Sequence, residues 1–158
     1  MNDTINKLNM AHCDHPLRVF LVEDSLEIRD LMVENMAMIE GLTVAGMAES
    51  EDEALSRLQA DTFDILIVDI QLKKGNGINL LRNIADNTKF AAALKIICSN
   101  NASEVFRRVG RQYGVNHFYD KTSEFPQLFA LLQETAARQE CRDANALPGR
   151  DGRSGSRA

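Results

Sequence analysis

The chain has 158 residues, of which 44% are hydrophobic and 26% are charged, and its net charge at pH 7 is −5. This composition is typical of one soluble globular domain with an ordinary core, and the negative charge argues against a broad nucleic-acid surface. The sequence contains no apolar run long enough to span a bilayer, and its start lacks the apolar stretch of a signal peptide.

The beginning of the chain offers few structural signals. Residues 1–15 are polar and unpatterned, so we expect a flexible N-terminal tail. The sequence HCDH at residues 12–15 carries metal-ligand side chains, but an ordinary polar tail is the commoner explanation, and no second ligand cluster supports a zinc site. The three cysteines, Cys13, Cys98 and Cys141, are too sparse for a disulfide framework and indicate a reducing cytoplasm.

Five apolar, β-branched segments alternate with five segments of helical spacing. The strand-like segments are Leu17–Asp24, Leu42–Glu49, Phe63–Asp69, Ala92–Asn100 and Val115–Lys121. Apolar residues recur every three or four positions after each of them: Ile28, Met32, Met36 and Ile39; Leu55 and Leu58; Leu80, Leu81 and Ile84; Val105, Val109 and Tyr113; Phe125, Leu128 and Leu132. This alternation predicts an α/β fold, the flavodoxin-like doubly wound (βα)5 architecture, with a five-stranded parallel sheet in the order 2-1-3-4-5 and helices on both faces.

The composition changes near the end of the chain. From about Glu140 the sequence is rich in Gly, Arg, Ser and Asp and has almost no apolar residues. We therefore expect the folded domain to span residues 16–139 and residues 140–158 to form a disordered C-terminal tail.

Polar side chains stand where four of the predicted strands end. The first strand ends in Glu23 and Asp24, the third in Asp69, the fourth in Ser99 and the fifth in Lys121. The carboxyl ends of parallel strands lie at one edge of the sheet, where open α/β folds bind their ligands. Each residue alone could be a helix cap, a turn residue or a solvated lysine. Their common position favours one shared site.

Three neighbouring carboxylates raise one another's pKa values unless a cation lies between them. Mg²⁺ suits such a site, because it prefers a few carboxylates together with water and phosphoryl oxygens. With a lysine and a hydroxyl added, the set is suited to phosphoryl transfer, and a carboxylate nucleophile would form an acyl phosphate. Asp69, on the central strand, is the best candidate for that nucleophile.

These motifs, VED, VD, CSN and DK, resemble the receiver domain of two-component response regulators. Asp69 follows Asp24 by 45 residues and precedes Ser99 by 30 and Lys121 by 52. Gly77 follows Asp69 by eight residues, where the family carries a glycine. Both the residue types and their spacing therefore agree with the family pattern.

The resemblance covers about residues 17–137 and implies roles for the matching positions. Asp69 would accept phosphoryl from a phosphohistidine on a sensor histidine kinase or a histidine phosphotransfer protein. Mg²⁺ would be held by Glu23, Asp24, Asp69 and the backbone carbonyl of Gln71. The chain would then be a phosphoacceptor signalling protein rather than an enzyme, although it could promote its own phosphotransfer and dephosphorylation.

Further roles follow from the same resemblance. Lys121 would contact the phosphoryl oxygens, and Ser99 would move to hydrogen-bond the phosphoryl group. Tyr119, two residues before the lysine, would be the aromatic switch residue that swings inward behind Ser99. Gln71 and Asn101 match the variable positions that tune dephosphorylation.

Four positions depart from the common family pattern. Leu72 and Lys73 stand where Met-Pro often follows, and we interpret the lysine pair, Lys73 and Lys74, as solvent-facing, with guidance of the kinase as the alternative. Thr122 replaces the proline that usually follows the lysine, which puts the loop geometry there in question. Asn100 stands where a small residue is common and could narrow access to the site.

No output domain follows the fifth predicted helix, so the expected protein is a stand-alone receiver. Its message would be a changed protein-binding surface for an unknown downstream protein, formed by the fourth helix, the fifth strand and the fifth helix. Arg107, Arg108 and Arg111 lie on that fourth helix, although each alone is read as a solvated side chain. We expect no direct DNA binding and no membrane contact, and a homodimer on phosphorylation is compatible with the resemblance.

Two other classes compete with this interpretation. A phosphatase of the haloacid dehalogenase type would need a second aspartate two residues after Asp69, where the chain has Gln71. A degenerate receiver that acts as an unphosphorylated binding module would have lost part of the acidic pair, the phosphoacceptor or the lysine. None of these residues is lost, which favours the phosphorylated receiver.

Overall fold

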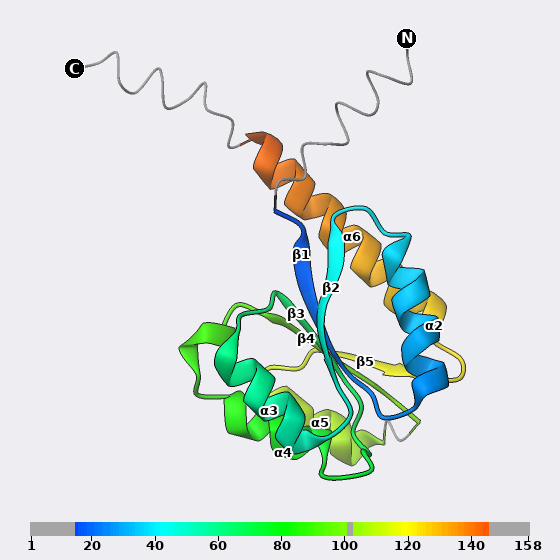
Figure 1. The fold of residues 1–158 in the computed structure, drawn as a ribbon, viewed down its shortest axis with the longest axis vertical. Helices are drawn as coiled ribbons and strands as arrows, with labels where there is room; N and C mark the ends of the chain where they lie inside the picture. Colours follow the sequence, from blue (N-terminus) through cyan, green and yellow to red (C-terminus); the bar gives the residue numbers. More distant parts are fainter. Residues whose placement is uncertain (1–14, 101–102, 146–158) are drawn as a thin grey trace, which may run out of the picture.

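A five-stranded parallel sheet lies between two layers of helices in a computed structural model, which describes residues 15–100 and 103–145 (Figure 1). The neighbouring strands run in the order β2-β1-β3-β4-β5. This is the predicted doubly wound α/β fold, and the prediction is confirmed. The strands are β1 (Leu17–Val22), β2 (Leu42–Ala48), β3 (Ile65–Val68), β4 (Leu94–Ser99) and β5 (His117–Asp120).

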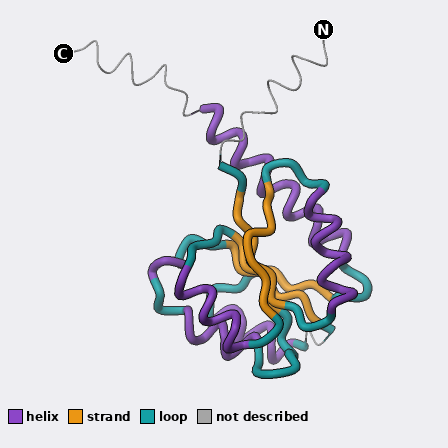
Figure 2. Tube along the Cα trace, in the orientation of Figure 1, coloured by secondary structure: helices purple, strands orange, loops and turns teal. Residues whose placement is uncertain are grey.

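The helices divide between the two faces of the sheet (Figure 2). On one face lie α2 (Leu26–Ala37) and α6 (Phe125–Asn145), and on the other lie α3 (Glu51–Ala60), α4 (Gly77–Ile84) and α5 (Glu104–Gln112). A short 3₁₀ turn, η1 (Thr88–Phe90), precedes β4. None of the helices in the described part of the chain is both long enough and apolar enough to span a membrane.

The central strand β3 is buried on both faces, as its unbroken apolar sequence predicts. Leu66 and Val68 pack in the core beneath α3, α4 and α5, whereas Ile65 and Ile67 pack in the core beneath α2 and α6. All four side chains are at most 1% exposed. Asp69 follows them directly, so the core itself holds this carboxylate at the carboxyl edge of the sheet.

The inward face of α5 differs from the predicted one. Val105, which the helical spacing placed toward the core, is 64% exposed. The side of α5 that meets the sheet carries Gly110, where a Cβ atom would lie 2.8 Å from the Phe118 ring, with Phe106 and Tyr113 packed against the same core. The closest helix–sheet approach is therefore made by a glycine, which a search for apolar periodicity does not register.

The final helix extends past the predicted domain end. α6 continues to Asn145, whereas the composition places the start of a disordered tail near Glu140. Among the side chains of α6 that the structure describes, which end at Cys141, the last buried one is Ala136, and Glu140 and Cys141 are exposed. Residues 146–158, like residues 1–14, lie outside the described residues, and with them lies the HCDH segment up to Asp14.

Removing residues 140–158 is expected to lower the thermal midpoint by no more than about 5 °C, because the final helical turns bury no described side chain after Ala136. Calorimetry on chains ending at Gln139 and at Asn145 tests this expectation. A much larger drop for the chain ending at Gln139 alone would show that the last helical turns stabilise the domain.

Candidate functional site

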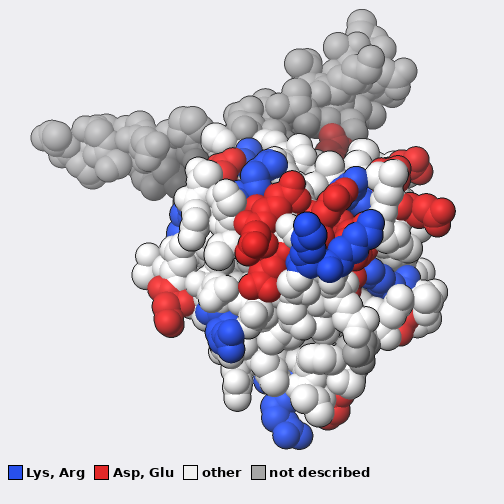
Figure 3. Space-filling model, turned by 60° about the horizontal axis from the view of Figure 1, so that its bottom comes forward, with Lys and Arg blue, Asp and Glu red and all other residues white. Residues whose placement is uncertain are grey.

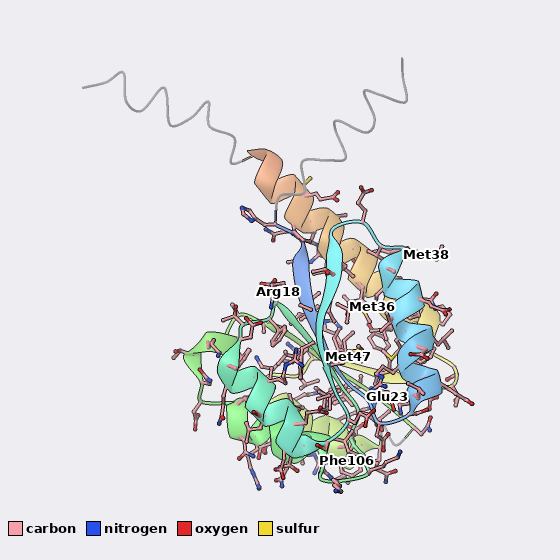
Figure 4. The ribbon with its side chains drawn as sticks, viewed as in Figure 1. Arg18, Glu23, Met36, Met38, Met47 and Phe106 are labelled. Atoms are coloured by element: carbon pink, nitrogen blue, oxygen red, sulfur yellow. The ribbon has the colours of Figure 1, made fainter. Side chains whose placement is uncertain are left out.

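Three carboxylates and one lysine meet where three strands end. Glu23 and Asp24 follow β1, and Asp69 follows β3. One oxygen atom from each of these three residues lies within 4.8 Å of the others. Lys121 follows β5 and completes the group. Figure 4 places Glu23 at the end of the sheet opposite to Arg18, which marks the amino end of β1. The predicted convergence at the carboxyl edge is therefore observed.

Lys121 binds two carboxylates at once. Its Nζ atom donates to Asp69 Oδ2 at 2.6 Å and lies 2.7 Å from Glu23 Oε1. The three side chains are only 8%, 5% and 2% exposed for Lys121, Asp69 and Glu23. The second carboxylate oxygen of Glu23 accepts a hydrogen bond from the Ser25 backbone N–H at 2.9 Å. Buried charges of this kind are stable only when they are paired in this way.

Burial and pairing act in opposite directions on these charges. Burial raises the pKa of Glu23 above its ordinary value, although hydrogen bonds from Lys121 and Ser25 oppose the change. Burial by itself lowers the pKa of Lys121, but its bonds to Asp69 and Glu23 outweigh this effect and raise the pKa. Lys121 is therefore protonated at neutral pH, and its ammonium group stabilises the charged form of Glu23 against the effect of burial.

Gly77 lets the following helix begin directly behind the phosphoacceptor candidate. A Cβ atom at this position would lie 2.0 Å from the Asp69 carbonyl oxygen. The Gly77 backbone N–H donates to the Ile70 carbonyl at 2.8 Å, and Asn76 caps α4 by accepting from the Ile78 N–H at 2.7 Å. Any side chain at position 77 would push α4 away from the site, which explains the glycine there.

Hydrogen bonds, rather than a proline, fix the conformation of the loop after Lys121. Asp120 Oδ1 accepts hydrogen bonds from the Thr122 N–H at 2.7 Å, the Thr122 hydroxyl at 2.5 Å and the Ser123 N–H at 3.2 Å. Glu124 Oε1 in turn accepts from the Asp120 N–H at 2.9 Å. No cis peptide bond occurs among the described residues. Asp120 thus orders the turn that leads from Lys121 into α6.

Acidic side chains gather at the carboxyl end of the sheet, and basic side chains lie next to them (Figure 3). Lys73 is exposed, in agreement with its solvent-facing interpretation, while Leu72 packs against the core. Asn100 is exposed, and Asn101 lies outside the described residues. Both acidic and basic side chains therefore border the site on this face of the protein.

Ser99 and Tyr119 lie on opposite faces of the sheet. Side chains alternate along a strand, and Ile97 and Cys98 belong to the two different cores, so Ser99 shares the Ile97 face, beneath α5. On β5, Phe118 packs in that same core, whereas Tyr119 packs on the face of α6. Tyr119 cannot swing in behind Ser99 without crossing the sheet, so this placement argues against its predicted switch role.

Phe118 is the aromatic residue that the sequence reasoning missed. It is 7% exposed, and it contacts Gly110 on α5 closely. The guanidinium carbons of Arg107 and Arg111 lie 5.5 and 5.9 Å from the ring centroid, which are cation–π distances. Arg107 is half-buried, whereas Arg108 and Arg111 are exposed, so only Arg107 departs from the interpretation as a solvated side chain. Only the strand register, which pairs Ile97 with Phe118, shows that this ring shares the face of Ser99.

The donor set fits a magnesium ion. Glu23, Asp24 and Asp69 offer three converging carboxylate oxygens, and Mg²⁺ binds oxygen ligands in such groups. Gln71, the source of the predicted backbone ligand, is exposed and pairs with Asn76 in an isolated bridge two residues after Asp69. The excess negative charge of the carboxylates over Lys121 further favours a divalent cation.

Comparison with known proteins identifies the family. The family model for the response regulator receiver domain matches residues 19–133. The chain is 37% identical over 68 residues to the DNA-binding transcriptional activator DevR/DosR of Mycobacterium tuberculosis, covering 43% of this chain and 31% of that protein. It is 27% identical over 121 residues to the transcriptional regulatory protein CpxR of Klebsiella pneumoniae, covering 77% and 50% of the two chains.

Solved structures agree on the fold. A receiver domain protein (CheY-like) from Methanospirillum hungatei superimposes with a TM-score of 0.68 at 22% identity, over 81% of this chain and 99% of that one. The chemotaxis protein CheY4 of Vibrio cholerae gives 0.67 at 21% identity, over 76% and 98%. Among the curated relatives compared, the chain spans from 19% to 52% of the relative's own length. The protein belongs to the response regulator receiver domain family of two-component signalling systems.

Proposed function

We propose that this receiver domain accepts a phosphoryl group onto Asp69 from a phosphohistidine on a sensor histidine kinase or a histidine phosphotransfer protein. The observation that carries the proposal is the buried group in which Lys121 pairs with both Asp69 and Glu23, next to Asp24. A fixed nucleophilic carboxylate flanked by cationic groups is what phosphoryl transfer requires. The free thiols of Cys98 and Cys141 support a cytoplasmic location as part of this proposal.

In the proposed reaction, a carboxylate oxygen of Asp69 attacks phosphorus while the P–N bond of the phosphohistidine breaks. The electron pair of that bond remains on the imidazole nitrogen, and Asp69 becomes an acyl phosphate. Mg²⁺, held by Glu23, Asp24, Asp69 and the Gln71 carbonyl, would neutralise charge on the transferring oxygens. Lys121 keeps the Asp69 carboxylate in place before transfer and donates to a phosphoryl oxygen after it, and Ser99 supplies a hydroxyl donor.

The protein is expected to gain one phosphoryl group when it is incubated with a small-molecule phosphodonor and Mg²⁺, as measured by intact mass spectrometry. Chelation of Mg²⁺ should abolish the gain, because three close carboxylates otherwise repel the phosphoryl oxygens. An equal gain in excess chelator would contradict the proposed metal site. No gain under either condition would favour the alternative function, an unphosphorylated binding module.

The proposed output is a changed protein-binding surface on α5, β5 and α6. A phosphoryl group on Asp69 adds acceptor oxygens, and Ser99 lies on the adjacent strand on the face that α5 covers. Phe118 packs on this face between Ile97 and Gly110, with Arg107 and Arg111 above its ring. A shift at Ser99 would therefore reach α5 through Phe118, and this surface would carry the message to a downstream protein.

Ser99→Ala is expected to accept phosphoryl on Asp69 but to lose most of the response on α5, because the hydroxyl that links the phosphoryl group to this face is gone. Amide chemical shifts recorded with and without phosphodonor measure the response. In the wild type, the shifts should concentrate around Phe118 and Gly110. Shifts concentrated around Tyr119 instead, or an unchanged α5 response in Ser99→Ala, would contradict this route.

A further inference from the structure

The loop between β3 and α4, residues 69–76, turns back on itself beside the site. Gln71 and Asn76 form an isolated antiparallel bridge, and the Gly77 N–H donates to the Ile70 carbonyl at 2.8 Å. Gln71, the proposed source of a carbonyl ligand for Mg²⁺, is thus paired with Asn76 across this loop. Whatever holds Asn76 also constrains Gln71.

Glu51 holds this loop from a different part of the chain, 25 residues before Asn76. Its Oε1 atom accepts a hydrogen bond from the Asn76 backbone N–H at 2.9 Å. Its own backbone N–H donates to the Lys74 carbonyl at 3.0 Å. One residue therefore binds the loop at two points, with both its backbone and its side chain.

Gly75 shows how closely the loop wraps around Glu51. A Cβ atom on Gly75 would lie 2.3 Å from the Glu51 Cβ and 2.7 Å from its Oε1. The φ angle of Gly75 is +92°, in the region that glycine adopts without strain. The loop conformation thus depends on glycine at 75 and on the side chain at 51 together.

Glu51 is held in place by the helix on which it lies. Glu51 begins α3, whose Ser50 cap accepts from the Glu53 N–H at 3.2 Å and whose Ala54 and Leu58 are at most 1% exposed. Asn76, at the other side of the hydrogen bond, caps α4. Glu51 therefore joins two packed helices to the loop that carries Gln71. A carboxylate needed only for the helix dipole would require no such contacts, and Asp52 in the same turn can serve that purpose.

We propose that Glu51 is a positioning residue for the metal site, which sets the place of the Gln71 carbonyl through the Asn76 amide. The inference rests on the proposed function, because Gln71 is a ligand only if Mg²⁺ binds at Asp69. Glu51 touches none of the reacting groups in this scheme. It raises Mg²⁺ affinity by reducing the number of conformations open to the loop before the ion arrives.

Three variants separate the hydrogen bond from the charge. Glu51→Ala removes both, Glu51→Gln keeps an acceptor oxygen without the charge, and Asp52→Ala removes a nearby exposed carboxylate from the same helical turn. Two readouts are used, neither of which needs phosphorylation. Hydrogen exchange of the Asn76 amide in the metal-free protein reports the contact, and amide-shift titration with Mg²⁺ alone reports the dissociation constant.

Glu51→Ala should speed exchange at Asn76 and weaken Mg²⁺ binding roughly 2- to 10-fold, the range that one hydrogen bond supports. Glu51→Gln and Asp52→Ala should stay near the wild-type dissociation constant. Equal weakening in Glu51→Gln and Glu51→Ala would assign the effect to charge and overturn the inference, as would faster exchange at Asn76 with unchanged Mg²⁺ affinity. A wild-type protein without saturable Mg²⁺ binding would contradict the metal site itself, and with it the proposed function.

Discussion

Asp69→Asn is expected to abolish the gain of one phosphoryl group that the wild type shows with a small-molecule phosphodonor and Mg²⁺. The amide removes the nucleophilic oxygen charge and one of the three carboxylates of the metal site while keeping nearly the same shape. No other carboxylate in the group combines a strand-end position on the central β3 with a direct bond to Lys121. Intact mass spectrometry measures the result.

A matched control separates this effect from the loss of any carboxylate. Asp86 is an exposed residue after α4, and Asp86→Asn should be phosphorylated like the wild type. The fold of Asp69→Asn is checked by its amide spectrum. Equal labelling of Asp69→Asn and the wild type would show that another residue is the phosphoacceptor.

Lys121→Met is expected to lower the free energy of unfolding by about 3–5 kcal/mol in the absence of Mg²⁺, the usual cost of breaking a buried ion pair. The substitution leaves Glu23 and Asp69 as neighbouring buried carboxylates without their shared cation. Denaturant titration measures the loss. Lys73→Met, at an exposed lysine, should change the free energy of unfolding by no more than about 0.5 kcal/mol.

The loss in Lys121→Met should depend on pH. Without the bond from Lys121, burial raises the pKa of Glu23 further above its ordinary value of 4.5. A carboxyl group whose pKa is raised in the folded protein contributes stability below its unfolded pKa, and loses it as the pH rises through the folded pKa. The difference from the wild type should therefore be smaller near pH 4.5 than at neutral pH, where Mg²⁺ should restore part of it. A loss independent of both pH and Mg²⁺ would contradict this account of the charges.

The fold could be predicted because the pattern of apolar residues in the sequence shows which segments are buried. A strand apolar at every position, as β3 is, fits only a sheet covered on both faces, and the alternating helices supply the cover. The carboxylates and Lys121 could be found for a related reason. Polar residues at the carboxyl ends of such buried strands lie at the edge of the sheet where α/β folds bind their ligands.

The switch residue could not be chosen from the sequence by type, because aromatic side chains stand at two successive positions, Phe118 and Tyr119. They point to opposite faces, and only the register that pairs Ile97 with Phe118 shows which one shares the face of Ser99. The sequence also did not allow us to predict that Glu51 and Asp120 support the site. Both act through hydrogen bonds to backbone groups in loops, which leave no periodic pattern.

Borohydride trapping of the phosphorylated protein tests the central claim most directly. An acyl phosphate on aspartate is reduced to a primary alcohol, so the phosphorylated residue becomes homoserine, which peptide mass spectrometry can locate in the chain. Our account predicts homoserine at position 69 alone, formed only after treatment with phosphodonor and Mg²⁺. Homoserine at position 24 instead, the alcohol with one more methylene that a glutamyl phosphate would give at position 23, or a phosphoryl group that resists borohydride would contradict the assignment of Asp69 as the phosphoacceptor.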